Sequence, residues 1–235
     1  MLRRSLFLLV VLGLIVAACG GGEKEAHPTP DSGVSQAVSF QTADGVTIGG
    51  HLFGDGKKLV ILCHMRPSDQ TSWYGFANEL AKAGYSALTF DFRGYGESTG
   101  RKDLPHIDRD IEAAIEEMRS EGYEPIYLVG ASMGGTASLI AAAQMEVAGV
   151  VAISAPADFE GLDAEKVADQ VSERKLFIAS KGDSSAMTSL ERLFERAPEP
   201  KEEKVFEGSE HGTNLLEGGH AAEAKAAIMA FLSGQ

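Results

Sequence analysis

The chain has 235 residues, of which 44% are hydrophobic and 23% are charged. This composition is typical of a soluble globular protein and excludes a collagen, a disordered tail or a protein with many membrane spans. The length suits one large hydrophobic core, so we expect a single domain of roughly 200 residues. The formal net charge is −13. Because binding to nucleic acid requires clustered Lys and Arg to neutralise phosphates, this acidic balance argues against nucleic acid as a partner.

The amino terminus has the pattern of an export signal. Two arginines at positions 3 and 4 precede an apolar run from Ser5 to Ala18. A basic region followed by a short hydrophobic region is typical of a secretory signal, and this run is short for a permanent membrane span. It ends in Val16-Ala17-Ala18-Cys19, which resembles the bacterial lipobox, where small residues precede a cysteine that becomes lipidated. The alternative is an ordinary cleaved signal with an incidental cysteine.

These features predict three regions along the chain. Residues 1–18 would be a signal peptide, residues 19–35 a lipidated flexible tether rich in Gly and charge, and residues 36–235 the folded domain. The protein would then be exported to the bacterial cell envelope and held on a membrane by a lipid anchor at Cys19. Which membrane, which face and which oligomeric state are not predicted.

The second cysteine and the histidines give no sign of a metal site. Cys63 ends the apolar run that begins at Leu59, so we expect a buried, unreactive thiol. The chain has no C-x-x-C or H-E-x-x-H motif and no cluster of His and Cys in its sequence. We therefore predict neither a metal nor a cofactor.

The rest of the chain alternates strand and helix patterns. The short continuous apolar runs are typical of strands buried on both faces of a mainly parallel sheet, with helices on both faces of it. The predicted strands are Ala37–Gln41, Val46–Phe53, Lys58–Cys63, Tyr85–Phe90, Pro125–Val129, Val147–Ser154, Lys175–Ser180 and Glu203–Phe206. The predicted helices are Thr71–Ala83, His106–Ser120, Met133–Gln144, Ala164–Val171, Ala186–Arg196 and Ala221–Phe231.

A candidate nucleophile follows the strand that ends at Val129. The sequence Gly130-Ala131-Ser132-Met133-Gly134 fits G-x-S-x-G between a strand and an Ala-rich helix. In a nucleophile elbow the serine occupies a strained turn that raises its hydroxyl above the sheet, and the glycines let strand and helix approach. The same turn points the N–H of Met133 toward a developing oxyanion. The alternative is a Gly-rich structural turn whose serine is unused.

With this motif in place, the chain resembles the α/β-hydrolase family from about Phe40 to Phe231. The resemblance implies an α/β-hydrolase fold with a minimal cap, and a catalytic acid and histidine that follow the serine in chain order. The implied acid is Asp183, in the loop after a strand, with Asp158 as the alternative one strand earlier. The implied base is His211, in a Gly-containing loop, whereas His220 is expected near the start of a helix.

Two further loops resemble those of the family. Cys63-His64-Met65-Arg66-Pro67 is similar to the loop that supplies a second oxyanion N–H, which we assign to Met65, with His64 ordering the loop through hydrogen bonds. Arg66 is expected either to hydrogen-bond within this loop or to be a solvated cation. The alternative is that Arg66 attracts an anionic substrate. The turn Asp91–Ser98 resembles D-x-R-G-x-G-x-S, in which Asp91 and Arg93 are expected to pair. The alternative is that Tyr95 or Ser98 of this turn contacts the substrate directly.

Together these residues predict a serine hydrolase with no cofactor. His211 would take the proton of Ser132, Asp183 would orient the imidazole, and an acyl-serine would form from a small-molecule acyl substrate. Only about twenty residues separate the strands that end near Ser154 and start near Lys175, which favours an open site and esters of small or accessible acyl groups. The alternatives are a peptidase or thioesterase with the same triad, and a non-catalytic envelope binding protein.

Overall fold

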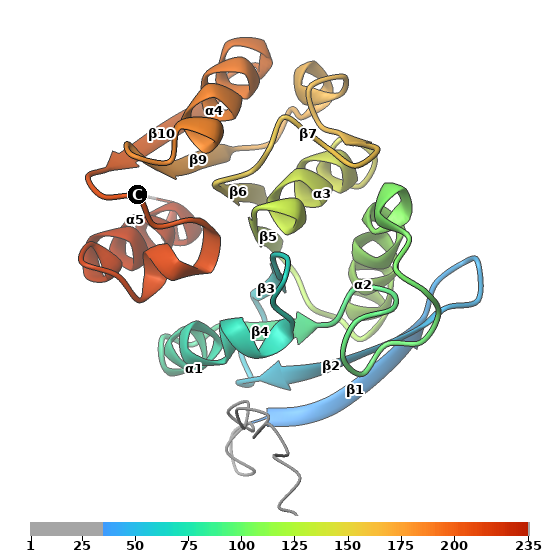
Figure 1. The fold of residues 1–235 in the computed structure, drawn as a ribbon. Coiled ribbons are helices and arrows are strands. Elements are labelled where there is room, and N and C mark those ends of the chain that lie inside the picture. Colours follow the sequence, from blue (N-terminus) through green and yellow to red (C-terminus); the bar gives the residue numbers. More distant parts are fainter. Residues whose placement is uncertain (1–34, 235) are drawn as a thin grey trace, which may run out of the picture.

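The computed structural model describes residues 35–234, and its centre is an eight-stranded sheet (Figure 1). The predicted signal peptide, the lipidation site Cys19 and almost all of the predicted tether lie outside the described residues. The strand order is β1-β2-β4-β3-β5-β6-β9-β10. The strands are β1 Ser35–Gln41, β2 Thr47–Phe53, β3 Leu59–Cys63, β4 Ser86–Phe90, β5 Ile126–Ala131, β6 Gly149–Ile153, β9 Lys175–Ser180 and β10 Lys201–Phe206.

The direction of the strands decides where their loops meet. β1 and β2 are antiparallel to each other, and β2 is antiparallel to β4. All neighbouring strands from β4 to β10 are parallel, so their carboxyl ends lie at one edge of the sheet. Burial explains the continuous apolar runs, since every residue of β3, β4 and β6 is buried. The expected mainly parallel central sheet is confirmed.

Within residues 35–234, five α-helices cover the two faces of the sheet (Figure 1). Their apolar residues divide between two core clusters, one under α2, α3 and α4 and the other under α1 and α5. Ile111 and Ile115 of α2 are fully buried, as their spacing on one helical stripe predicts. The helices are α1 Tyr74–Lys82, α2 Asp108–Ser120, α3 Met133–Ala142, α4 Ser184–Arg196 and α5 Ala221–Ser233. Within residues 35–234, no helix has the length and apolarity to cross a membrane.

The predicted helix over Ala164–Val171 is wrong. The chain between β6 and β9 instead forms a short hairpin, β7 Asp158–Phe159 and β8 Leu162–Asp163, and a 3-10 turn over Ala168–Gln170. The N–H of Glu165 donates to the carbonyl of Ala157 at 3.0 Å, and the N–H of Lys166 donates to the Asp163 carboxylate at 3.1 Å. These bonds satisfy the backbone groups that would start a helix, and the same apolar residues are buried without one.

Candidate active site

Ser132 forms the sharp turn between β5 and α3. Its backbone has φ 49° and ψ −121°, a left-handed conformation that costs energy for a residue with a Cβ. The turn is held from both sides, because the Ser132 N–H donates to the carbonyl of Ile153 at 2.8 Å and the Ser132 carbonyl accepts from Thr136 N–H at 3.0 Å. Strain held this way at the carboxyl edge of a sheet is typical of a functional position.

Two glycines beside Ser132 make this turn sterically feasible. A Cβ at Gly130 would lie 2.3 Å from the carbonyl oxygen of Gly134, and one at Gly134 would lie 2.4 Å from the carbonyl oxygen of Cys63. Both contacts are with backbone atoms, which cannot move aside cheaply. The glycines of the motif are therefore required by the close approach of β3, β5 and α3.

His211 lies between Ser132 and Asp183 within hydrogen-bonding distance of both. The Ser132 hydroxyl is 2.8 Å from His211 Nε2, and His211 Nδ1 is 2.5 Å from Asp183 Oδ2. Since a carboxylate oxygen accepts, Nδ1 carries the proton and donates it, which leaves Nε2 as the acceptor for the serine. The Asp183 side chain is 10% exposed and the His211 side chain 39% exposed. A small molecule can thus reach the imidazole, whereas the carboxylate is sheltered.

Local hydrogen bonds fix the carboxylate and the histidine loop. Asp183 caps the amino end of α4, where its Oδ1 accepts from Ala186 N–H at 3.2 Å and from the Ser185 hydroxyl at 3.1 Å, so only Oδ2 faces His211. The Ser180 hydroxyl at the end of β9 donates to the carbonyl of Glu210 at 2.7 Å. These bonds hold the acid loop and the histidine loop against each other.

The alternative residues lie elsewhere. Asp158 has a 66% exposed side chain on β7 and pairs with Arg192 at 3.6 Å. His220 immediately precedes α5, as expected, and its Nδ1 lies 2.7 Å from the Glu223 carboxylate. Of the two aspartates considered, Asp183 is the one that hydrogen-bonds His211.

The sequence predicts that the backbone N–H groups of Met133 and Met65 hold an oxyanion. Met133 is the first residue of α3, so its N–H has no acceptor within the helix, and it lies at the positive end of the helix dipole. Among residues 35–234, the N–H of Met65 makes no hydrogen bond to another backbone carbonyl. The Met65 side chain reaches the histidine loop, since a Cβ at Gly212 would lie 2.5 Å from Met65 Sδ. Whether Met65 supplies the second donor stays a prediction.

His64 stabilises the loop after β3 through hydrogen bonds of both ring nitrogens. The ring is fully buried, and its Nε2 accepts from Phe92 N–H at 3.1 Å, so Nδ1 carries the proton and donates to the carbonyl of Met65 at 3.0 Å. Burial lowers the pKa of His64, which favours the neutral ring. His64 therefore makes the hydrogen bonds that the sequence predicts for a residue that orders the loop after β3.

The expected pairing of Asp91 with Arg93 is wrong. Asp91 instead accepts hydrogen bonds from Gln70, through its backbone N–H and side-chain amide, and from Glu97 N–H. Arg93 forms ion pairs with Asp110 of α2 at 2.7 Å and with Asp44 of the β1–β2 turn at 2.8 Å. The loop is pinned as expected, but by partners that tertiary packing brings from other elements. No local motif marks Asp110 as a partner of Arg93, because the two residues are 17 positions apart.

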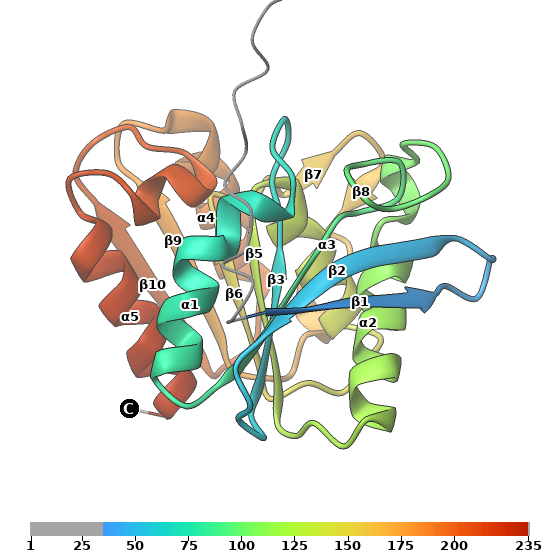
Figure 2. The same cartoon turned by 90° about the horizontal axis from the view of Figure 1, so that it is seen from below.

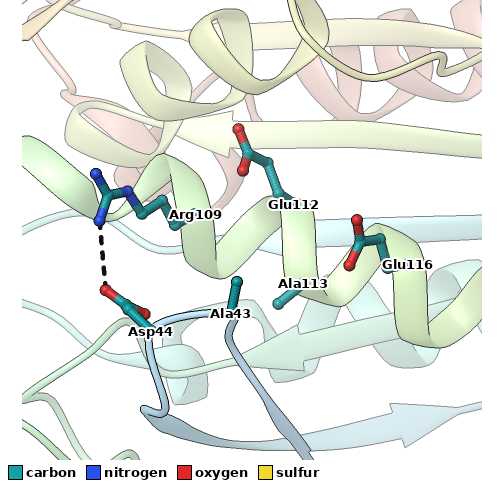
Figure 3. Close-up of a pocket in the computed structure, with 6 residues that line it drawn as sticks. All are labelled: Ala43, Asp44, Arg109, Glu112, Ala113 and Glu116. Carbon is teal, nitrogen blue, oxygen red and sulfur yellow. Dashed lines mark ion pairs between the residues drawn. The ribbon is translucent and has the colours of Figure 1, made fainter.

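A pocket of about 310 Å³ lies at the β1–β2 turn, and none of Ser132, Asp183 and His211 lines it (Figure 3). Arg109 on α2 pairs there with Asp44 at 3.5 Å. Arg93, which hydrogen-bonds Asp44 from outside the pocket, holds the pKa of that carboxyl well below its usual range. None of the residues predicted from the sequence as site residues lines the pocket, whose walls are Ala43, Asp44, Arg109, Glu112, Ala113 and Glu116.

The second cysteine has the predicted environment. Cys63 is fully buried, and burial raises its pKa to about 12, so it remains a thiol rather than a reactive thiolate at neutral pH. In the part of the chain that the structure describes, no group of three or more His, Cys, Asp or Glu residues is arranged to hold a metal ion.

Comparisons with known proteins agree with the fold. An uncharacterized protein of Mycobacterium tuberculosis is 28% identical over 225 residues, covering 82% of this chain and 80% of that protein. Serine hydrolase BPHL of Mus musculus is 28% identical over 124 residues, covering 51% and 43%. A solved esterase from Pyrococcus furiosus has the same fold, with a TM-score of 0.76 at 20% identity over 87% of this chain and 92% of that one. Residues 58–214 match the family described as alpha/beta hydrolase fold. This match spans more than half of the chain, which therefore belongs to the α/β-hydrolase fold family.

Proposed function

We propose that this chain is a serine hydrolase that cleaves carboxylic esters of small or accessible acyl groups through an acyl-serine intermediate. The observation that carries the proposal is the continuous hydrogen-bonded series from the Ser132 hydroxyl to His211 at 2.8 Å and from His211 to Asp183 at 2.5 Å. Three residues far apart in the sequence form the series. Ser132 donates to His211 Nε2, and His211 Nδ1 donates to the Asp183 carboxylate, which is the arrangement that nucleophilic catalysis needs.

The reaction follows from these positions. His211 Nε2 accepts the Ser132 proton as Oγ attacks the ester carbonyl, and Asp183 stabilises the imidazolium that forms. The N–H groups of Met133 and Met65 donate to the oxyanion of the tetrahedral intermediate. His211 then gives its proton to the departing alcohol, which leaves an acyl-serine. A water molecule deprotonated by His211 attacks the acyl group, and the acid is released as Ser132 regains its proton.

The chain between β6 and β9 supports the preference for accessible acyl groups. Over residues 154–174 the structure has only the β7–β8 hairpin and one 3-10 turn, with no helix to cover Ser132. A site that buried a long chain would gain roughly 0.8 kcal/mol per buried methylene. In a panel of p-nitrophenyl esters, we expect kcat/KM to stop rising at short acyl chains.

A fluorophosphonate probe and matched variants test the triad. We expect the wild type to be labelled, Ser132→Ala to be unlabelled, and Asp183→Asn to lose about 10⁴-fold in kcat because the imidazole would hold the wrong tautomer. Asp158→Asn is the matched control, since its exposed carboxylate pairs with Arg192, and we expect it to retain wild-type kcat.

Three results would change the proposal. A wild type that the probe does not label would favour a non-catalytic binding protein. A larger loss in Asp158→Asn than in Asp183→Asn would move the acid to β7. Faster turnover of an aminoacyl amide or a thioester than of the matched ester would favour a peptidase or thioesterase with the same triad.

A further inference from the structure

An ion pair joins the loop after β3 to the β7–β8 hairpin next to the proposed oxyanion site. Arg66 directly follows Met65, and its Nη2 lies 2.8 Å from the Glu160 carboxylate at the hairpin turn. Its guanidinium also lies 5.0 Å from the centre of the Phe159 ring. Figure 2 shows this loop and the hairpin at the same end of the sheet. Both charged side chains are about half exposed, so the pair is accessible to solutes.

A tyrosine hydroxyl without a partner lies close to this ion pair. Tyr95 is 6% exposed, and its buried hydroxyl has no hydrogen-bond partner among the described residues. Leaving a buried polar group unpaired is costly, so an acceptor from outside the chain would stabilise this hydroxyl. Burial raises the pKa of Tyr95, with Arg66 lowering it and Glu160 raising it through their charges, so the hydroxyl remains a donor at neutral pH.

A second cation faces the same tyrosine. Lys102 Nζ lies 4.0 Å from the centre of the Tyr95 ring and forms no ion pair within residues 35–234. Arg66, Tyr95, Lys102 and Glu160 line one pocket of about 380 Å³, together with residues 103–105. Two carboxylates also line the pocket: Glu160 is paired with Arg66, and Asp103 contacts His106 at 3.0 Å. If Glu160 left the pocket, its lining would carry the two cations Arg66 and Lys102 against the single carboxylate of Asp103, and this excess of positive charge would favour an anion.

We propose that this pocket binds a carboxylate carried by the ester substrate, which displaces Glu160 from Arg66 and accepts hydrogen bonds from Arg66, Lys102 and the Tyr95 hydroxyl. The inference rests on the proposed function and names its substrate class, esters that bear a free carboxylate. Glu160 occupies the site when no substrate is present and keeps Arg66 oriented. Displacement exposes the Tyr95 hydroxyl and gives it the acceptor that it lacks.

Matched ester pairs test this proposal. One pair is the p-nitrophenyl hemi-ester of adipic acid and its neutral methyl ester, with the carboxylate on the acyl side. The other is 4-butyryloxybenzoate and its methyl ester, with the carboxylate on the alcohol side. For the anionic member of at least one pair, we expect Arg66→Gln to raise KM about tenfold and Tyr95→Phe to raise it about threefold. Glu160→Gln should lower that KM about threefold, because Arg66 is then free.

The neutral esters and a distant ion pair are the controls. KM for the neutral members should stay unchanged in all three variants, and Glu124→Gln, which breaks a similarly exposed pair with Arg119, should change no KM. Equal effects on anionic and neutral members, or a rise in the anionic KM in Glu160→Gln, would overturn the proposal. Those results would mean that the ion pair is only structural.

A binding measurement separates this inference from the proposed function. Wild-type turnover of the neutral esters tests the hydrolase, whereas calorimetric titration of monomethyl adipate into Ser132→Ala tests the pocket without turnover. In that background we expect Arg66→Gln to weaken binding about tenfold and Glu160→Gln to strengthen it. Absence of any difference between these variants would contradict the pocket even if ester hydrolysis is found.

Discussion

His64 is a neutral, fully buried histidine whose two ring nitrogens are both hydrogen-bonded to backbone groups. Burial is the largest influence on its pKa and lowers it, although Asp91 and the Met65 carbonyl act in the opposite direction. In the unfolded chain the same ring would titrate near its usual pKa of about 6.5. The unfolded state therefore binds more protons than the folded state in the pH range just below that value.

This difference predicts how stability depends on pH. The contribution of His64 is fully present above about pH 6.5 and is lost as the pH falls toward the lower pKa of the folded state, by at most about 1.4 kcal/mol per pH unit. In urea denaturation between about pH 7.5 and about pH 5.5, His64→Gln should therefore lose less unfolding free energy than the wild type does. Equal pH slopes in His64→Gln and the wild type would contradict this account.

Residue types could be predicted from the sequence better than their partners could. Ser132 and His211 stand in local motifs, so their positions in the chain already indicate a nucleophile and a base. The choice between Asp183 and Asp158 had to come from chain order and family resemblance, and the geometry now separates them. The partners of Arg93 lie 17 and 49 residues away, and only tertiary packing brings them to it.

Arg93 joins three elements at the level of secondary structure. Its guanidinium bonds to Asp110 on α2 and to Asp44 in the β1–β2 turn, and its own backbone follows β4. Arg93 is 3% exposed and Asp110 is fully buried. Burial raises the pKa of Asp110 to about 6 even with Arg93 beside it, which shows how strongly the carboxylate depends on a partner.

Removing one partner of this buried pair should be costly. We expect Arg93→Met to lower the free energy of unfolding by about 3–5 kcal/mol, because Asp110 would be left as an uncompensated buried charge. The double variant Arg93→Met/Asp110→Leu should lose clearly less than the sum of the single variants in a urea-denaturation cycle. Arg119→Met, which breaks an exposed pair with Glu124, should cost at most about 1 kcal/mol. Strict additivity in the cycle would refute the coupling.

Strands and helices with a clear hydrophobic period could be predicted from the sequence, whereas very short strands could not. The eight strands and five of the six predicted helices agree with the structure to within a few residues. The β7–β8 hairpin has two residues in each strand, too few for an alternating pattern. Contacts with α3 hold these residues in place. The hairpin therefore depends on tertiary packing and has no local sequence pattern that would predict it.

At the scale of the whole molecule, parallel strands explain why one edge of the sheet holds the site. Ser132 follows β5, Asp183 follows β9 and His211 follows β10, and all three strands have the same direction. The alternation of strands and helices predicts that these three residues lie at one edge of the sheet. The order of the strands, which sets the distances between the residues, could not be predicted from the apolar runs. β6 lies between β5 and β9, and the histidine loop bends back to reach Ser132.

At the scale of the whole molecule, we propose that a lipid anchor at Cys19, which lies outside the described residues, holds the protein on a membrane. Made in a bacterium with lipoprotein processing, the full chain should enter the detergent phase of a Triton X-114 separation, because two or more acyl chains give stable membrane binding that one chain does not. Cys19→Ser should remain in the aqueous phase with unchanged kcat toward soluble esters. Cys63→Ala, which changes the buried cysteine of β3, should partition like the wild type. Detergent-phase recovery of Cys19→Ser equal to that of the wild type would show that this cysteine is incidental and that the segment 1–18 acts in another way.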